Sequence, residues 1–310
     1  MRILITGGAG CLGSSLIEKY LPLGNEIFVI DNFATGKRES VPELEGLTLV
    51  EGDISDDELV KNCFDKFGPT HVIHSAAAYK DLTNWVSDTE TNVLGTINVA
   101  KAALRIGVKK FINFQTALCY GRPEIIPIPV THKTAPFTSY GISKTAGEQY
   151  LLQSGLPVIS LRLANICGPR LSIGPIPTFY TRLKEGKSVF CSDTVRDFLD
   201  MSDFLSLMDI ILADTDVTGV FNVSTGKGNS IKDVFDVVSE YVGIKVENVP
   251  VVPAGADDVQ SVVLDPSLTE STFNWKAEVG FVDTIKRQLK LYDQYGVTDI
   301  FSHLTPQDKK

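Results

Sequence analysis

The first twenty or so residues contain a pattern that few folds accommodate. A short apolar run, Arg2-Ile-Leu-Ile-Thr6, leads directly into Gly7-Gly-Ala-Gly-Cys-Leu-Gly13, and residues 14–21 continue with helical spacing. In such a strand–turn–helix unit the glycines permit a tight turn, close approach of a pyrophosphate and close helix packing. The unpaired N–H groups at the helix start attract the anion. The pattern therefore predicts a dinucleotide site formed by Gly7, Gly10, Cys11, Leu12 and Gly13.

A second apolar run, Glu26-Ile-Phe-Val-Ile30, ends at Asp31, eighteen residues after Gly13. A carboxylate at this place hydrogen-bonds the adenosine ribose and repels a 2′-phosphate, which favours NAD over NADP. Lys37 and Arg38 follow shortly and could accept such a phosphate, so NADP stays open at this point. We predict NAD as the cofactor, with Asp31 and Asn32 in its site.

Strand-like and helical runs alternate through the first two-thirds of the chain. The expected strands are 47–51, 71–74, 110–114 and 157–163, and the expected helices are 55–67, 88–106 and 140–154. This alternation predicts an α/β fold, a Rossmann-like doubly wound parallel sheet. After Gly168, prolines at 169, 175 and 177 interrupt the pattern, and helices are expected at 178–185, 230–241 and 282–295.

The change of pattern indicates two parts. We expect residues 1–165 to form the NAD-binding domain and residues 166–310 to form mainly a smaller, C-terminal substrate-binding lobe. A strand near residues 220–224 is expected to return to the first domain.

Composition excludes several classes of function. The net charge of −9 argues against a nucleic-acid or anionic-membrane surface. No apolar stretch approaches the roughly 20 residues of a membrane span, and the start does not read as a signal peptide. Five scattered cysteines are typical of reduced thiols in the cytoplasm, and four scattered histidines suggest no metal site.

Tyr140 and Lys144 are four residues apart in Ser139-Tyr-Gly-Ile-Ser-Lys144, so a helix places both on one face. An ammonium beside a phenol favours the phenolate, and the tyrosine could then act as a base near neutral pH. A shift of about three pKa units requires roughly 4 kcal/mol, more than one solvated lysine supplies. An oxidised nicotinamide would add the second positive charge. Taken alone, the pair could equally be an exposed helix pair without function.

The combination of motifs resembles the extended short-chain dehydrogenase/reductases. The motifs that carry the resemblance, beyond those above, are Gly52-Asp53, His74-Ser-Ala-Ala-Ala78, Asn92, Leu161-Arg-Leu-Ala-Asn-Ile-Cys-Gly-Pro-Arg170 and Arg196-Asp-Phe-Leu-Asp-Met-Ser-Asp203. The chain is most similar to the NAD-dependent sugar-nucleotide epimerase/dehydratase branch, and within it to members from bacterial O-antigen gene clusters. The resemblance implies enzymes that oxidise a sugar carbon and later return the hydride. It also implies a homodimer formed through the Tyr140 helix and helix 88–106.

The resemblance also implies roles for residues around the cofactor. Asp53 matches a position that hydrogen-bonds adenine, although it could instead cap the helix that follows. Ala76 and Ala77 match small residues that line the pyrophosphate and the nicotinamide ribose. The remaining residues expected in this shell are Ile54, Ala78, Asn92, Tyr140 and Lys144, of which Lys144 is expected to contact the nicotinamide ribose.

For catalysis, Thr116 matches a hydroxyl that hydrogen-bonds the reacting sugar oxygen, and it completes a triad with Tyr140 and Lys144. In similar 4,6-dehydratases an Asp-Glu pair follows, decarboxylases carry a glutamate nearby, and GDP-sugar epimerase–reductases carry a cysteine at the second position. Here these residues are Ala117 and Leu118, which cannot transfer protons. We therefore expect C4 epimerisation of a UDP-linked hexose, N-acetylhexosamine or uronic acid. The alternatives are a nucleotide-sugar oxidoreductase or dehydratase and a non-catalytic NAD-sensing protein.

On the substrate side, Asn165 and Arg196 match positions that contact the diphosphate, although Arg196 could instead pair with Asp197 or Asp200. Other expected substrate residues are Lys80, Thr178, Phe179 and Phe190, and Lys80 together with Arg122 would suit a carboxylated sugar. One departure concerns an arginine that similar enzymes carry before a late Gly-Asp. Residues 252–260 lack it, and Arg170 or Arg182 could replace it. The resemblance does not specify the sugar.

Overall fold

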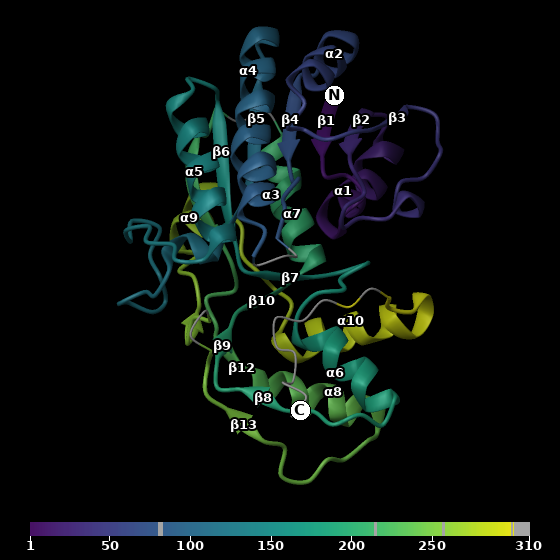
Figure 1. Cartoon of the computed structure of the whole chain (residues 1–310), viewed down its shortest axis with the longest axis vertical. Helices are drawn as coiled ribbons and strands as arrows, with labels where there is room; N and C mark the ends of the chain where they lie inside the picture. Colours follow the sequence, from purple (N-terminus) through teal and green to yellow (C-terminus); the bar gives the residue numbers. More distant parts are fainter. Residues whose placement is uncertain (80–82, 214–215, 256–257, 299, 301–310) are drawn as a thin grey trace.

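The computed structural model describes residues 1–79, 83–213, 216–255, 258–298 and 300. At its centre lies a seven-stranded sheet in the order β11-β6-β5-β4-β1-β2-β3, with every neighbouring pair parallel (Figure 1). The strands are β1 (Arg2–Thr6), β2 (Glu26–Asp31), β3 (Leu47–Glu51), β4 (His71–His74), β5 (Lys110–Thr116), β6 (Val158–Leu163) and β11 (Gly219–Val223). The chain order reverses between β1 and β4, and ligands of doubly wound sheets bind at such a point. The predicted fold class is confirmed.

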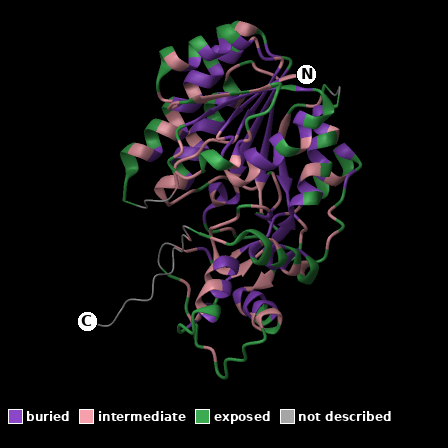
Figure 2. Cartoon of the chain, turned by 90° about the vertical axis from the view of Figure 1, so that its right-hand side faces the viewer, coloured by how far each residue is buried: buried purple, intermediate pink, exposed green. Residues whose placement is uncertain are grey.

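Helices cover both faces of this sheet. One face packs against α1 (Cys11–Tyr20), α7 (Met201–Leu212) and α9 (Ser267–Phe273), and the other against α2 (Asp57–Phe67), α4 (Thr96–Ile106) and α5 (Ser139–Gln153). The central strands are buried on both faces, as Figure 2 shows. This burial explains why they read as continuous apolar runs. Each fully buried aliphatic side chain stabilises the fold by about 1.5–3 kcal/mol.

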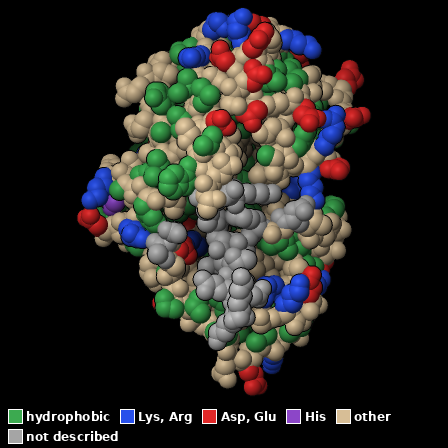
Figure 3. Space-filling view, in the orientation of Figure 1, with side chains coloured by type: hydrophobic (Ala, Val, Ile, Leu, Met, Phe, Trp, Pro, Cys, Tyr) green, Lys and Arg blue, Asp and Glu red, His purple; other side chains and the backbone are tan. Residues whose placement is uncertain are grey.

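A smaller lobe lies below the sheet in Figure 1 and has its own apolar core. Its helices are α6 (Pro175–Lys184), α8 (Ile231–Val242) and α10 (Phe281–Tyr295), and its paired strands are β8 (Cys191–Ser192) and β13 (Val251–Val252). The other short strands are β7 (Asn165–Cys167), β9 (Val195–Arg196), β10 (Phe198–Asp200), β12 (Asn229–Ser230) and β14 (Ser261–Val262). Figure 3 shows acidic and basic side chains interspersed on one face of the molecule.

Within the described ranges, no helix combines the length and the apolar composition that a membrane span requires. The remaining helical segments are short. They are η1 (Leu21–Leu23), η2 (Arg38–Ser40), α3 (Trp85–Thr89), η3 (Glu90–Gly95) and η4 (Ala117–Tyr120).

The structure differs from the expected elements in three places. The helix expected at 88–106 consists of α3, the π turn η3 and α4. Helix α6 begins at Pro175 rather than 178, because proline is tolerated in the first turn of a helix. Helix α7 was not expected, and with α9 it accompanies β11 back to the first domain.

Candidate active site

The carboxyl ends of β1, β2, β4 and β5 surround a cleft of about 460 Å³ together with the first turns of α1 and α5. Parallel strands place these ends at one edge of a sheet, where ligands bind. The predicted residues that line it are Gly7, Gly10, Cys11, Leu12, Asp31, Asn32, Asp53, Ile54, Ala76, Ala77, Ala78, Thr116, Tyr140 and Lys144. The cleft thus brings together all three predicted catalytic residues and most of the predicted cofactor residues.

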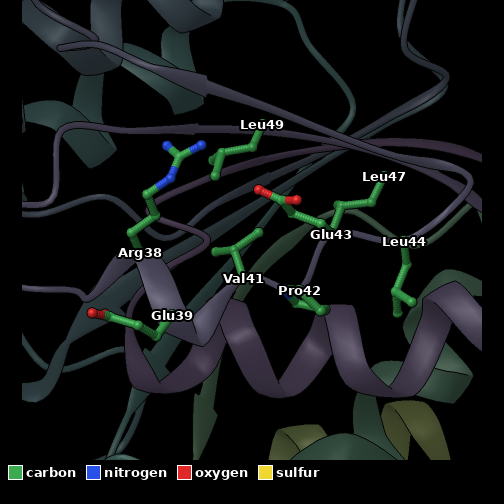
Figure 4. Close-up of a pocket in the computed structure, with 8 residues that line it drawn as sticks. All are labelled: Arg38, Glu39, Val41, Pro42, Glu43, Leu44, Leu47 and Leu49. Atoms are coloured by element: carbon green, nitrogen blue, oxygen red, sulfur yellow. The ribbon is translucent and has the colours of Figure 1, made fainter.

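A second hollow, of about 610 Å³, lies at the edge of the sheet beside β3 (Figure 4). Its lining comes from one stretch of chain and consists of Arg38, Glu39, Val41, Pro42, Glu43, Leu44, Leu47 and Leu49. None of the residues predicted to take part in chemistry lies there. The smaller cleft is therefore the candidate site.

The glycine loop between β1 and α1 leaves space for a bound pyrophosphate. Gly7 has a φ of +70°, and a Cβ there would lie 2.6 Å from the backbone nitrogen of Ala76, so a larger residue would not fit. A Cβ on Gly13 would lie 2.6 Å from the Cα of Gly8, so glycine lets α1 start directly against the loop. Gly10 lines the cleft beside the start of α1. These positions fit a dinucleotide whose phosphates lie against the N-terminus of α1.

Asp31 ends β2 at the edge of the cleft, and two backbone groups hold its carboxylate. The N–H groups of Ala9 and Phe33 each donate a hydrogen bond to it at 2.8 Å. Burial raises the pKa of this carboxyl, and the two hydrogen bonds act in the opposite direction. The remaining lone pairs of the carboxylate fit a ribose diol.

Asp53 and Asn32 form the next part of the cleft wall. Asn32 Nδ2 donates to Asp53 at 2.7 Å, and the N–H of Ser55 donates to the same carboxylate at 2.8 Å. Helix α2 is capped by Asp56, which accepts from the N–H of Leu59 at 3.0 Å. The alternative in which Asp53 caps this helix is therefore wrong. Asp53 is held at the cleft, where its predicted contact with adenine remains a proposal.

Strand β5 and helix α5 bring the predicted triad together. Thr116 is the last residue of β5, and Tyr140 and Lys144 lie in the first two turns of α5. The N-cap Thr138 fixes the start of this helix by accepting a hydrogen bond from Gly141 at 3.1 Å. Hydrogen bonding from the Thr116 hydroxyl lowers the pKa of the Tyr140 phenol, because a donor favours the phenolate.

Burial nevertheless dominates the electrostatics of this pair. It raises the pKa of Tyr140, with a smaller contribution from Tyr79 in the same direction, and outweighs the bond from Thr116. The same burial lowers the pKa of Lys144 to about 8, although Glu148 opposes the shift. At neutral pH the protein alone therefore holds a neutral phenol beside an ammonium. A phenolate requires a further positive charge in the cleft.

Asn92 lies on the π turn η3 and does not line the cleft, because its buried amide is used by the protein. Its Oδ1 accepts from the N–H of Ala78 at 2.9 Å, and its Nδ2 donates to the Ala78 carbonyl at 2.9 Å and to Ser143 Oγ at 3.0 Å. Asn92 thus joins the loop after β4 to α5. Any role in cofactor binding passes through Ala78.

The residues predicted for the nucleoside pocket lie in the smaller lobe. Phe179 is only 4% exposed and packs edge-on against Phe235 at 5.4 Å, in the core of that lobe. Its ring is not available to a nucleoside, so this prediction is corrected by its burial. Thr178 Oγ1 donates to the Gly174 carbonyl at 2.8 Å, and Phe190 is half-buried.

Arg196 on β9 is held by partners that the sequence did not indicate. Its guanidinium donates to the backbone carbonyls of Val195 and Val259, both at 2.8 Å, and pairs with Asp258. Neither Asp197 nor Asp200 is the partner. Asp258 lies within residues 252–260, the segment that lacks the arginine of similar enzymes. A carboxylate therefore stands near the position that a guanidinium takes in those enzymes.

The other predicted substrate contacts are dispersed. Asn165 is exposed on β7, and its Nδ2 donates to a backbone carbonyl at 3.0 Å. Arg170 pairs with Glu18 of α1. Arg182, on α6, donates to a backbone carbonyl of the loop that follows this helix at 2.6 Å. Lys80 lies outside the described residues.

Several residues of the cleft were not identified from the sequence: Thr35, Ser75, Tyr79, Asn84, Ser87, Gln115, Leu163 and Ala164. The ring of Tyr79 lies edge-on to Tyr140 at 6.2 Å, and burial raises the pKa of its hydroxyl. One signal was present for Thr35. A Cβ on the adjacent Gly36 would lie 2.6 Å from the backbone of Ala9, so this glycine marks a loop packed on the glycine turn. Nothing local to Tyr79 identifies its position.

Known proteins show the same combination of features. The chain matches the model of the NAD dependent epimerase/dehydratase family over residues 3–224. It is similar to the enzyme WbmG of Bordetella bronchiseptica, solved in complex with NAD and UDP, with 68% identity and a TM-score of 0.94 over 98% of this chain and 99% of that chain.

Two further relatives are named as 4-epimerases. The UDP-glucose 4-epimerase of Thermotoga maritima, solved with UDP-glucose, shows 28% identity and a TM-score of 0.86 over 95% of this chain and 99% of that chain. A putative UDP-glucose 4-epimerase of Methanocaldococcus jannaschii is 29% identical over 92% of this chain and 96% of its own length. The glycine loop, Asp31 and the triad all lie inside the matched region. This chain therefore belongs to the NAD dependent epimerase/dehydratase family.

Proposed function

We propose that this protein is an NAD-dependent epimerase that inverts C4 of a UDP-sugar through a transient 4-keto intermediate. The observation that carries the proposal is that Thr116, Tyr140 and Lys144 line one cleft, while the residues that follow Thr116 are the apolar Ala117 and Leu118. Tyr140 can move one proton to and from a sugar hydroxyl, whereas Ala117 and Leu118 cannot assist the elimination of water. The NAD and UDP bound to WbmG and the names of the two 4-epimerases support the same cofactor and nucleotide. The scattered cysteines support a place in the cytoplasm. The resemblance supports a role in the synthesis of O-antigen-like polysaccharide precursors.

The protein groups have separate tasks in this reaction. Tyr140 accepts the proton of the C4 hydroxyl, and it returns that proton to the carbonyl oxygen after the sugar has presented its other face. Thr116 orients the reacting oxygen and lowers the pKa of Tyr140. Lys144, as an ammonium below about pH 8, keeps a positive charge beside the phenol. Bound NAD supplies the hydride acceptor and donor at C4 and the further positive charge.

Arg196 is the residue we propose for the substrate diphosphate, together with Asn165. Asp258 and two backbone carbonyls hold the plane of the guanidinium, which has five N–H donors in all. A fixed guanidinium suits bidentate contact with phosphate. Asp258 thus orients the guanidinium of Arg196. Asp258 itself lies in the segment where similar enzymes carry a second arginine.

The test of this function uses the protein as purified. We expect it to release NAD when denatured, and to interconvert a pair of C4-epimeric UDP-sugars from a panel of hexoses, N-acetylhexosamines and uronic acids followed by NMR. No lasting change is expected in absorbance at the nicotinamide band. Loss of water, or net accumulation of reduced cofactor, would contradict the proposal and indicate a dehydratase or an oxidoreductase. Bound NAD without turnover of any sugar would indicate a sensing protein.

Asp31→Ala is expected to weaken NAD binding by about 10- to 100-fold, because hydrogen bonds to a charged group are lost. The preference against NADP should also relax, since the repelling carboxylate is gone. The dissociation constants of both cofactors for cofactor-free protein measure this. Asp56→Ala is the matched control, because Asp56 caps α2. An unchanged ratio of the two constants would show that Asp31 does not select the cofactor.

We propose that the protein forms a homodimer through α5 and the α3–α4 helix. Large apolar side chains are exposed along these two helices, and Figure 3 shows hydrophobic side chains gathered over this part of the molecule. They are Trp85, Val86, Leu94, Ile142 and Tyr150. Contiguous exposed apolar surface of this kind marks an interface.

Ile142→Glu is expected to convert the dimer into a monomer, because a charge would be buried where the exposed Ile142 side chain meets the partner. Sedimentation equilibrium measures the mass. Leu268→Glu, at an exposed leucine on α9, is the control and should leave the mass unchanged. A monomeric parent protein, or a dimer that survives Ile142→Glu, would rule out this interface.

A further inference from the structure

The side chain of Gln115 connects the two segments that carry the triad. Gln115 precedes Thr116 at the end of β5 and is 2% exposed. Its Nε2 donates to the backbone carbonyl of Lys144 at 2.9 Å, and its Oε1 accepts from the N–H of Thr116 at 2.7 Å. One amide therefore contacts the strand end that bears Thr116 and the helix that bears Tyr140 and Lys144.

We propose that Gln115 is a positioning residue of this enzyme, which sets the distance between the hydroxyl of Thr116 and that of Tyr140. This inference rests on the proposed function only for its effect on turnover. Gln115 acts through its neighbours, because both ends of its amide bond to backbone groups.

The hydrogen-bond chemistry allows one orientation of this amide. The Lys144 carbonyl only accepts and the Thr116 N–H only donates, so the amide must present its NH₂ group to α5 and its oxygen to β5. The hydrogen bond to the Lys144 carbonyl is buried and the bond from the Thr116 N–H is partly buried, so leaving either unmade is costly. The amide thus fixes the position of α5 along the direction of β5.

The hydrogen bonds of the sheet do not fix the position of α5 relative to β5. The pairing of β5 with β6 ends at Thr116 opposite Leu163, and α5 lies on the face of the sheet rather than in its ladder. Thr116 has a second constraint on its hydroxyl, which accepts from the N–H of Leu118 at 3.1 Å. A hydroxyl held in this way meets Tyr140 correctly only if α5 is also in place.

Asn113 provides a matched comparison on the same strand. It lies two residues before Gln115, so its side chain points to the same face, and it is also 2% exposed. Its Nδ2 donates to Ser160 Oγ at 3.0 Å rather than to a triad residue. Removing either amide disturbs a buried hydrogen bond, but only the loss of Gln115 should reach Thr116.

The first test compares Gln115→Met with Asn113→Leu. Gln115→Met keeps the length of the side chain and removes both hydrogen bonds, and we expect kcat to fall by about 10- to 100-fold, as small misplacements of catalytic groups do. NAD and UDP dissociation constants should stay within about twofold of those of the parent protein. Asn113→Leu should lower the thermal midpoint but keep kcat within about threefold. In a Thr116→Val background, Gln115→Met should cost less than about threefold, because coupled residues are not additive.

The second test does not depend on turnover. Ionisation of Tyr140 is read from the ultraviolet difference spectrum of NAD-loaded protein against Tyr140→Phe. Because the bond from Thr116 lowers the pKa of Tyr140, Gln115→Met should move this ionisation to higher pH, and Asn113→Leu should not. If no UDP-sugar is interconverted, the proposed function fails while this measurement still decides the role of Gln115.

Gln115→Glu is a variant in which a lower pH should restore kcat. The protonated carboxyl of this variant offers one donor and one acceptor, as the amide does, whereas the ionised form loses the donor to α5. Charged or titratable groups on the packed elements are Lys144 and Glu148 of α5, Arg162 of β6 and the neutral His74 of β4. Only the protonated carboxyl of Gln115→Glu can donate to α5. The ratio of the kcat of this variant to that of the parent protein should therefore rise as the pH falls. Parent-like kcat and parent-like Tyr140 ionisation in Gln115→Met would overturn the proposal, as would full additivity with Thr116→Val.

Discussion

Tyr140→Phe is expected to lower kcat by about 10²- to 10⁴-fold, the usual contribution of a positioned acid or base. The substitution removes the oxygen that accepts the proton of the sugar, which is the group whose pKa Thr116 lowers. Ala117 and Leu118 cannot take over, because neither can transfer a proton. The Tyr140 ring packs against Tyr79, and phenylalanine retains this contact, so the fold and bound NAD should be kept.

Initial rates of C4 epimerisation, with NAD content measured on the same sample, check this result. Tyr150→Phe is the matched control, because Tyr150 lies on the same helix with its side chain 55% exposed. Its rate should equal that of the parent protein. If Tyr140→Phe keeps NAD and retains more than about a tenth of the parent rate, Tyr140 is not the proton acceptor.

Arg162→Met is expected to destabilise the protein by about 3–5 kcal/mol, the usual effect of breaking a buried ion pair. Glu148 and Arg162 side chains are 0% and 6% exposed, and Arg162 donates to the carboxylate from Nη2 at 2.7 Å and from Nε at 3.3 Å. Ser160 Oγ adds a third bond at 2.6 Å. The substitution leaves a buried carboxylate without its counter-charge, one helical turn from Lys144.

Urea unfolding at pH 7 measures this loss. The control is the double variant Glu148→Gln with Arg162→Met, in which no buried charge remains and a large part of the stability should return. A fall of less than about 1 kcal/mol in the single variant would show that the pair contributes no more than a surface ion pair.

Much of the site could be predicted because its signals are local. The glycines, Asp31 and the Tyr140–Lys144 spacing depend on strand, turn and helix geometry that a short stretch of chain determines. Thr116 was identified through the family resemblance, and its place at the end of a strand fits this role because parallel strands deliver their ends to one edge of the sheet. The fold class followed from the same alternation of strands and helices.

The residues that escaped prediction depend on packing between distant segments. Arg196 meets Asp258 only because β9 pairs with β14, and these strands are about sixty residues apart. Phe179 reads as a candidate for the pocket until Phe235 is seen to cover it. Gln115 contacts Lys144 across twenty-nine positions, and no spacing rule connects a strand residue to a carbonyl on a later helix.

Gly147 lets α5 pack closely against the neighbouring helix. A Cβ there would lie 3.1 Å from Thr96 Oγ1, and the carbonyl oxygen of Asn92 is also close by, so α5 is seated directly against the neighbouring helix. One side of α5 carries Tyr140 and Lys144, and its exposed side carries Ile142 and Tyr150. Because close-packed interiors transmit strain, a larger side chain at Gly147 would displace α5 and move Tyr140 and Lys144 with it.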